Sequence, residues 1–149
     1  MPIRFFREGI NFQLKQKNLL RQWLMGSSQA EGFSIQSLTF VFMNDKNLLA
    51  LNRQYLHHDE YTDIITFDLS EKSGRKKKEI EGEIYISIER VKENAKIFGK
   101  TFQEELHRVM IHGVLHLCGY SDKTSASQKK MRAMEDFYLK KLKDKISVA

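Results

Sequence analysis

Apolar residues recur along the chain with two periods, one typical of helices and the other of strands. A stripe over residues 19–24 has helical spacing and predicts a first helix that ends near Gly26 or Gly32. The stretch SLTFVFM, residues 37–43, places apolar side chains on both faces, which is typical of a strand that is covered on both sides. Residues 3–6 offer a further strand.

The middle of the chain predicts one more helix and two more strands. Asn44 or Asp45 can cap this helix, because apolar residues then recur at helical spacing over residues 48–56. The stretches TDIITF, residues 62–67, and GEIYISI, residues 82–88, have the composition and alternation of strands. The middle of the chain is therefore expected to contribute several strands to the fold.

The last third of the sequence predicts helices. A short helix is expected from Val91 to Phe98, and Thr101 with Glu104 has the capping-box spacing that begins the next one. Thr124 or Ser125 can begin a final helix, with lysines outward and apolar residues inward. The residues expected to point inward are Met131, Met134, Phe137 and Tyr138.

The predicted order of elements is helix, strand, helix, two strands and then helices. This order is typical of an α/β or α+β fold, here with a small mixed four-stranded sheet and about five helices. The chain has 149 residues, with neither an internal repeat nor a linker-like change in composition. Residues 1–149 are therefore expected to form one domain with its own core.

Charge and cysteine content narrow the classes of function. The 25 Lys and Arg residues exceed the 19 Asp and Glu residues, and the net charge of +6 suits either binding to a polyanion or simple solubility. The run GRKKKE at 74–79 is expected to be a solvated loop or a contact to a phosphate backbone. Cys118 is the only cysteine, which excludes an intrachain disulfide, and we interpret it as a core residue. Without a signal-like or bilayer-spanning segment, a cytoplasmic protein with no membrane partner is expected.

The stretch HGVLHLCGYSD carries the candidate chemistry. His112 and His116 are four apart, so on a helix their Cβ atoms lie roughly 5–6 Å apart on one face. Gly119 favours the left-handed turn that ends a helix, which returns Asp122 toward both imidazoles. These three ligands predict one Zn²⁺ per chain with a fourth position open to water. The alternative is that His112 and His116 are ordinary histidines on a helix surface and that Asp122 caps the next helix. His107 lies around the helix from this pair, and we expect it to be a surface residue or a hydrogen-bonded core residue.

Gly113 separates this motif from the His-Glu-x-x-His metalloproteases, in which a glutamate after the first histidine acts as the general base. Glycine transfers no proton, so a peptidase would need a base from elsewhere in the chain. In a basic protein, a phosphodiester is the favoured substrate, because a metal stabilises the charge that develops on the phosphoryl group.

Three blocks of this sequence resemble the YbeY family: HGVLHLCGY, LNRQYLHHDEYTDIITF at 51–67, and GEIYIS at 82–87. Members of this family are metal-dependent endoribonucleases specific for single strands, which act in ribosomal RNA maturation and ribosome quality control. The resemblance implies a cytoplasmic enzyme whose partners are single-stranded ribosomal RNA and the small ribosomal subunit. The alternatives are a ribosome-associated factor with a structural metal, or a metallopeptidase.

The chain departs from the family pattern His-Gly-x-Leu-His-Leu-x-Gly-Tyr-Asp-His at its end. His112 and His116 match the first two zinc ligands, whereas Ser121 replaces the aspartate and Asp122 the third histidine. Because aspartate also binds zinc, the resemblance implies His112, His116 and Asp122 as ligands. The added negative charge should make the metal a weaker Lewis acid.

A second departure is Leu56, which stands where the family usually has an arginine that would be expected to hold a phosphate. The sequence does not choose among the residues that can replace it, and these catalytic candidates are Arg53, His57, His58 and Arg108. Asn52, Thr62 and Asp63 also match the family blocks, where they serve either substrate contacts or capping and turn hydrogen bonds.

Overall fold

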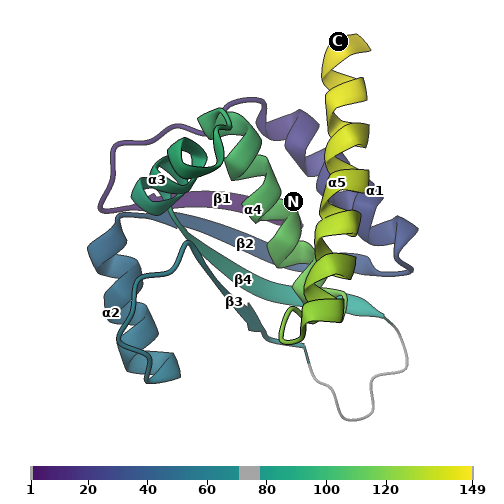
Figure 1. The fold of residues 1–149 in the computed structure, drawn as a ribbon. Coiled ribbons are helices and arrows are strands. Elements are labelled where there is room, and N and C mark those ends of the chain that lie inside the picture. The colour runs from purple at the N-terminus through teal and green to yellow at the C-terminus, as the bar shows by residue number, and fades with distance from the viewer. Residues whose placement is uncertain (1, 71–77, 149) are drawn as a thin grey trace.

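Four strands form a mixed sheet in the computed structural model, which describes residues 2–70 and 78–148 (Figure 1). The strands are β1 (Ile3–Glu8), β2 (Ser34–Met43), β3 (Ile64–Asp68) and β4 (Glu79–Ser87). Their order in the sheet is β1-β2-β4-β3, in which β1, β2 and β4 are parallel and β3 is antiparallel to β4. The predicted mixed sheet is confirmed, including the strand at the N-terminus.

Helices cover both faces of this sheet, unequally. The helices are α1 (Lys17–Ala30), α2 (Asp45–Leu56), α3 (Ile88–Phe98), α4 (Phe102–Leu117) and α5 (Ser125–Val148). Residues of α1, α3, α4 and α5 share the main core with one face of the sheet. Helix α2 contributes to a smaller cluster with Met43 and Ile65 on the opposite face. The α+β class is thereby confirmed.

Strand β2 shows how the sequence pattern produces the two clusters. Phe40 and Phe42 lie in the main core, while Met43 packs against Leu48 of α2 in the second cluster. Burial of each such side chain stabilises the fold by about 1.5–3 kcal/mol. The apolar residues on both faces of this strand therefore reflect helices on both faces of the sheet.

Side-chain caps begin the helices where the sequence predicts them. The Asn44 side chain accepts a hydrogen bond from the Asn47 amide at 2.7 Å, which begins α2. Thr101 and Glu104 form the reciprocal capping box of α4, with hydrogen bonds of 3.0 and 3.1 Å. Each cap satisfies an amide that has no partner within its own helix.

The sequence predictions for two helices held only in part. Helix α1 passes through Gly26, which lies on its exposed face, and ends at Ala30, close to the second predicted stop at Gly32, where φ is 86°. Phe137 is 50% exposed rather than inward, since the buried face of α5 is formed by Met131, Glu135, Tyr138 and Leu142. At the end of α2, Tyr55 and Leu56 are exposed, and the last buried residue of this helix is Asn52.

The cationic run at 74–79 falls mostly outside the described residues, which resume at Lys78. Across the described ranges, no helix combines the length and hydropathy that a bilayer crossing requires.

Candidate metal centre

Helix α4 lies close against the sheet because two glycines remove the side chains that would separate them. A Cβ on Gly113 would lie 2.9 Å from Cδ1 of Ile84 and 3.0 Å from Cδ1 of Ile64. A Cβ on Gly82 of β4 would meet the Phe67 carbonyl oxygen at 2.9 Å. Position 113 therefore faces the sheet, and no general base can project from it toward the metal ligands.

A left-handed turn at the end of α4 returns the chain toward the histidines. Gly119 has a φ of 101°, and its amide donates to the His116 carbonyl at 3.0 Å. The Gln128 side chain of α5 donates to the Asp122 carbonyl at 3.0 Å, which fixes the returning loop. The turn predicted at Gly119 is confirmed.

His112, His116 and Asp122 place one ligand atom each within 4.8 Å of one another. One carboxylate oxygen, Oδ2 of Asp122, lies 3.4 Å from Nε2 of His112 and 3.3 Å from Nε2 of His116. Zinc bonds of about 2.0–2.1 Å in a tetrahedron separate neighbouring ligand atoms by about 3.3–3.4 Å. All three donors therefore have the chemistry of a zinc site, and the two pairs that involve Asp122 also have its spacing. The side chains are partly exposed, at 21%, 27% and 42% respectively, so the site is open on one side.

The carboxylate of Glu135 in α5 contacts His112 at Nδ1, the ring nitrogen that does not face the candidate metal position. Its Oε2 lies 2.5 Å from Nδ1 of His112, and its Oε1 accepts a hydrogen bond of 2.7 Å from Arg108. A carboxylate at Nδ1 fixes the tautomer that leaves Nε2 free to bind a metal. Burial lowers the pKa of His112, but the Glu135 hydrogen bond and the charges of Glu135 and Asp122 outweigh it and raise the pKa overall. The surroundings of this imidazole thus favour positive charge.

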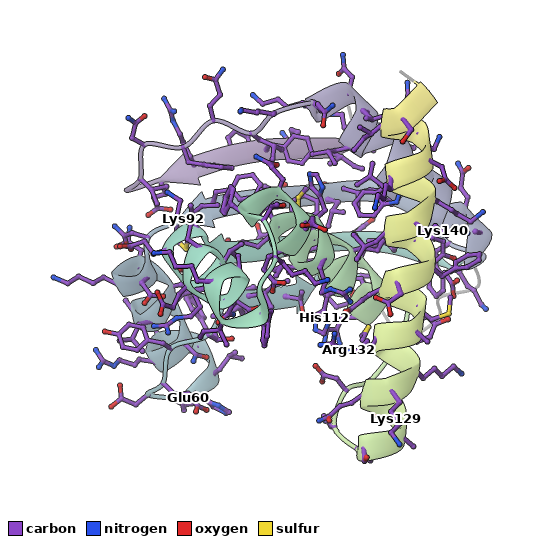
Figure 2. All side chains as sticks on the ribbon, turned by 45° about the horizontal axis from the view of Figure 1, so that its top comes forward. Glu60, Lys92, His112, Lys129, Arg132 and Lys140 are labelled. Atoms are coloured by element: carbon purple, nitrogen blue, oxygen red, sulfur yellow. The ribbon has the colours of Figure 1, made fainter. Side chains whose placement is uncertain are left out.

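Two of the candidate ligands, His112 and Asp122, line a pocket of about 420 Å³ between α3, α4 and α5. Arg132 of α5 and the exposed Phe98 at the end of α3 form part of its wall. Arg132 makes no ion pair with any residue that the structure describes. Figure 2 shows Arg132 on α5 close to His112. Asp63 lines the same pocket, and burial raises the pKa of its carboxyl group.

Among the catalytic candidates, the structure brings only Arg108 to this pocket. Arg108 is held by ion pairs to Glu135 at 2.7 Å and Asp136 at 2.6 Å. The other candidates lie around the exposed end of α2: Arg53 pairs with Asp59, His58 lies 3.6 Å from Glu60, and His57 ends the helix with a φ of 56°.

The family-block residues divide in the same way. Asn52 donates to the Glu60 carbonyl at 2.9 Å, and the Thr62 hydroxyl donates to the Ile64 carbonyl at 3.3 Å. These bonds fit the capping and turn interpretation, whereas Asp63 lies in the metal pocket. Leu56 borders a neighbouring pocket that shares Ile64 with the metal pocket.

Two residues at the site escaped the sequence analysis, namely Glu135 and Arg132. The signal for Glu135 was a carboxylate inside the apolar stripe Met131, Tyr138 and Leu142 of α5. Arg132 gave no signal, because one cation on a lysine-rich helix face is ordinary.

The structure contradicts the sequence interpretation of His107 but agrees with that of Cys118. His107 is buried, but its Nε2 has no hydrogen-bond partner among the described residues, so it is neither a surface residue nor a hydrogen-bonded core residue. Cys118 packs against the main core from a half-buried position. Burial and the nearby Glu31 raise the pKa of its thiol to about 12, which disfavours a thiolate ligand.

Comparison with known proteins extends the similarity over nearly the whole chain. The family described as Endoribonuclease YbeY matches residues 4–143. A protein of that name from Cytophaga hutchinsonii is 50% identical over 134 residues, which are 90% of this chain and 91% of that protein. Its namesake from Flavobacterium psychrophilum is 46% identical, over 91% of this chain and 93% of that protein. The solution structure of a Thermotoga maritima protein, 30% identical, matches with a TM-score of 0.66 over 98% of this chain and 92% of the other.

Proposed function

The chain belongs to the YbeY family of endoribonucleases, and from that premise we propose that it is a Zn²⁺-dependent endoribonuclease that cleaves single-stranded RNA. We propose ribosomal RNA as the substrate, in small-subunit maturation and ribosome quality control, and the cytoplasm as the compartment. The observation that carries the enzymatic proposal is the spacing of 3.3 and 3.4 Å between Asp122 Oδ2 and the two histidine Nε2 atoms.

The roles of the side chains follow from this geometry. His112, His116 and Asp122 would hold the zinc ion, and Glu135 would accept a hydrogen bond from Nδ1–H of His112 so that Nε2 stays unprotonated and faces the metal. A bound zinc ion supplies Lewis acidity toward a phosphate oxygen and a water whose pKa is lowered to about 7. Arg132 lies in the pocket wall, where its guanidinium can hold a phosphate of the strand.

An exposed row of cations supports RNA as the substrate. Lys129, Arg132 and Lys140 are exposed at successive places along α5 (Figure 2), and Arg132 among them lines the metal pocket. Cations in such a row attract a phosphate backbone without reading its sequence. The net charge of +6 gives the whole chain the same tendency.

The structure weighs against the two alternatives. A structural metal site is typically closed by four protein ligands, whereas these three are partly exposed beside a pocket of about 420 Å³. A metallopeptidase would need a general base from elsewhere in the chain, because Gly113 faces the sheet, and the match to the endoribonuclease family supports RNA over a peptide as the substrate. Residues from Ile3 to Leu142 share the main core, which supports the proposal that residues 1–149 act as one domain.

Cleavage of an end-labelled single-stranded RNA by the purified, zinc-loaded protein tests the proposal, beside His116→Ala prepared identically. The variant should lose cleavage, since two ligands hold zinc poorly, and a double-stranded RNA should resist the native enzyme. Equal cleavage by both proteins would reveal a contaminating nuclease, and an inert native protein would refute the proposal. Metal content after dialysis tests the ligand set: Asp122→Ala should retain much less zinc than the native chain.

A further inference from the structure

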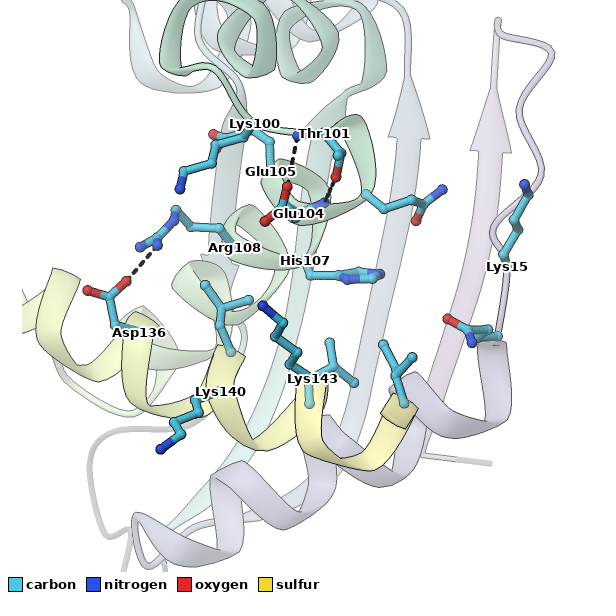
Figure 3. Close-up of a pocket in the computed structure, with 15 residues that line it drawn as sticks. Lys15, Lys100, Thr101, Glu104, Glu105, His107, Arg108, Asp136, Lys140 and Lys143 are labelled. Atoms are coloured by element: carbon cyan, nitrogen blue, oxygen red, sulfur yellow. Dashed lines mark hydrogen bonds and ion pairs between the residues drawn. The ribbon is translucent and has the colours of Figure 1, made fainter. Parts of the chain in front are cut away.

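A second, larger pocket lies beside the metal centre. It has a volume of about 760 Å³ and lies between the first half of α4, the second half of α5 and the residues before α1 (Figure 3). This α4–α5 pocket shares two wall residues, Glu105 and Arg108, with the metal pocket. Its volume is within the range of about 300–1,000 Å³ that is typical of small-molecule sites.

The wall of the α4–α5 pocket combines two kinds of side chain. The apolar part comes from α5 and consists of Leu139, Leu142 and Ile146. The cationic part consists of Lys15, Lys100, Lys140 and Lys143. Within the described residues, none of these four lysines forms an ion pair with a carboxylate.

Acidic side chains of the pocket are already engaged or buried. The Glu104 carboxylate accepts the Thr101 amide at 3.0 Å in the capping box, and Asp136 pairs with Arg108 at 2.6 Å. Burial raises the pKa of Glu105, which disfavours its charged form. The charged Glu104 attracts Lys100 and Lys143 but forms no ion pair with either, so the lysines can still bind an anionic ligand.

His107 supplies a polar group without a partner in the same wall. Its side chain is only 7% exposed, and its Nε2 has no hydrogen-bond partner among the described residues. Figure 3 shows the imidazole extending from α4 between Lys143 and Lys15. A buried polar atom without a partner costs about 1–3 kcal/mol. Nε2 is closed to the pocket in this conformation, so a ligand would satisfy it only if the His107 ring turned toward the pocket.

We propose that the α4–α5 pocket binds a nucleoside phosphate, with the base against the apolar wall and His107, and the phosphate among the lysines. In a substrate strand, this would be a nucleotide near the one held at the metal, because the two pockets share Glu105 and Arg108. This last step rests on the proposed ribonuclease function. The amide side chains of Gln16 and Gln103 suit the edge of a base, which a purely aliphatic anion would not use.

The only tryptophan provides a probe directly behind His107 in the pocket wall. The Trp23 ring lies 6.3 Å from the His107 ring, so a ligand beside His107 should change its fluorescence. Adenosine 5′-monophosphate, adenosine and inorganic phosphate are titrated separately into the native protein. The monophosphate should bind more tightly than either fragment. Phosphate that bound as tightly as the nucleotide would overturn the assignment of a base subsite.

A charge reversal on α5 tests the position of the phosphate. Lys140→Glu with Lys143→Glu should weaken binding of the monophosphate by about tenfold or more. Lys141→Glu with Lys145→Glu changes the net charge of the same helix equally, but neither residue lines the pocket. Both variants should keep the native melting temperature, because all four lysines are exposed. Equal weakening in both variants would contradict the proposal, since it would reveal only a general effect of charge.

Binding of a single-stranded oligoadenylate identifies the source of the nucleotide. The protein used here carries His116→Ala, which prevents cleavage. Adding Lys140→Glu and Lys143→Glu should reduce the slope of log binding constant against log salt concentration by about 1.4 if each lysine contacts a phosphate. If the lysine replacements abolish binding of the monophosphate but leave the salt slope of oligoadenylate binding unchanged, the pocket is assigned to a free nucleotide. If they change neither the monophosphate affinity nor the salt slope, the proposal is overturned. Because these measurements need no turnover, they fail separately from the cleavage assay that tests the proposed function.

Discussion

Glu135→Gln is the substitution that most directly tests the arrangement behind the metal ligands. The carboxylate has two acceptor oxygens, one 2.5 Å from Nδ1 of His112 and one 2.7 Å from Nη1 of Arg108. Glutamine keeps the shape but has only one oxygen, so its NH₂ group must face one of two donors. If it faces His112, the ring must carry its proton on Nε2, where the metal would bind.

The size of the effect follows from the hydrogen bond that is lost. A hydrogen bond to a charged group contributes about 1.5–3 kcal/mol, which corresponds to about a 10- to 150-fold change in an equilibrium constant. Residues that orient a metal-binding histidine typically change metal affinity by about 10- to 100-fold. We therefore expect the dissociation constant for Zn²⁺ to rise by about 10- to 100-fold in Glu135→Gln.

Competition with a chromophoric zinc chelator measures this constant for the native chain and the variant. Asp136→Asn is the matched control, because it removes a charge one residue further along α5 and disturbs Arg108, but it has no contact with His112. The control should bind zinc within about twofold of the native chain. A Glu135→Gln protein that binds zinc as tightly as the control would refute the supporting role of Glu135.

Three further predictions concern stability and RNA binding. Burial lowers the pKa of His107 to about 4, so between about pH 6.5 and 4 the unfolded chain takes up a proton there while the folded chain does not. The free energy of unfolding should therefore fall by about 3 kcal/mol as the pH is lowered over that range. Urea titrations should show a smaller loss in His107→Leu. Gly26→Ala should stabilise the chain by about 0.5–1 kcal/mol because its Cβ enters open space, whereas Gly113→Ala should be less stable than Gly26→Ala by about 1–3 kcal/mol in thermal unfolding because its Cβ meets the sheet. Leu56→Arg should leave stability within about 0.5 kcal/mol and steepen the salt dependence of RNA binding by about 0.7, whereas Leu69→Arg, the same charge on another exposed leucine, should not.

The fold was predictable where local patterns and packing agree. Residues 37–43 predicted a strand covered on both sides, and helices do cover both faces. Phe137 shows the limit of such patterns. An apolar residue at helical spacing was assigned inward, but Glu135 takes part of the buried face of α5 because His112 and Arg108 satisfy its carboxylate. Such a pairing spans two helices and has no local signal.

The cluster of candidate metal ligands was predictable because all three residues belong to one continuous segment. The spacing from His112 to His116 and the turn at Gly119 determine where Asp122 lies, and these are local properties of a helix and its end. The sequence explains the glycine at position 113 only in part. The sequence shows that a general base is missing, but only the packing against β4 and β3 shows that no side chain fits there.

The two departures from the family pattern act in the same direction on the charge of the site. Asp122 in place of a neutral imidazole would reduce the net charge of a bound metal and its ligands by one, and Leu56 stands where the family pattern has a cation that would attract a phosphate. Arg108 cannot fully compensate, because Glu135 and Asp136 already hold its guanidinium. Arg132 has no such partner among the described residues and lines the same pocket. The attraction of the pocket for a phosphate must therefore depend more strongly on Arg132 than it would in a site with three histidines and the family arginine.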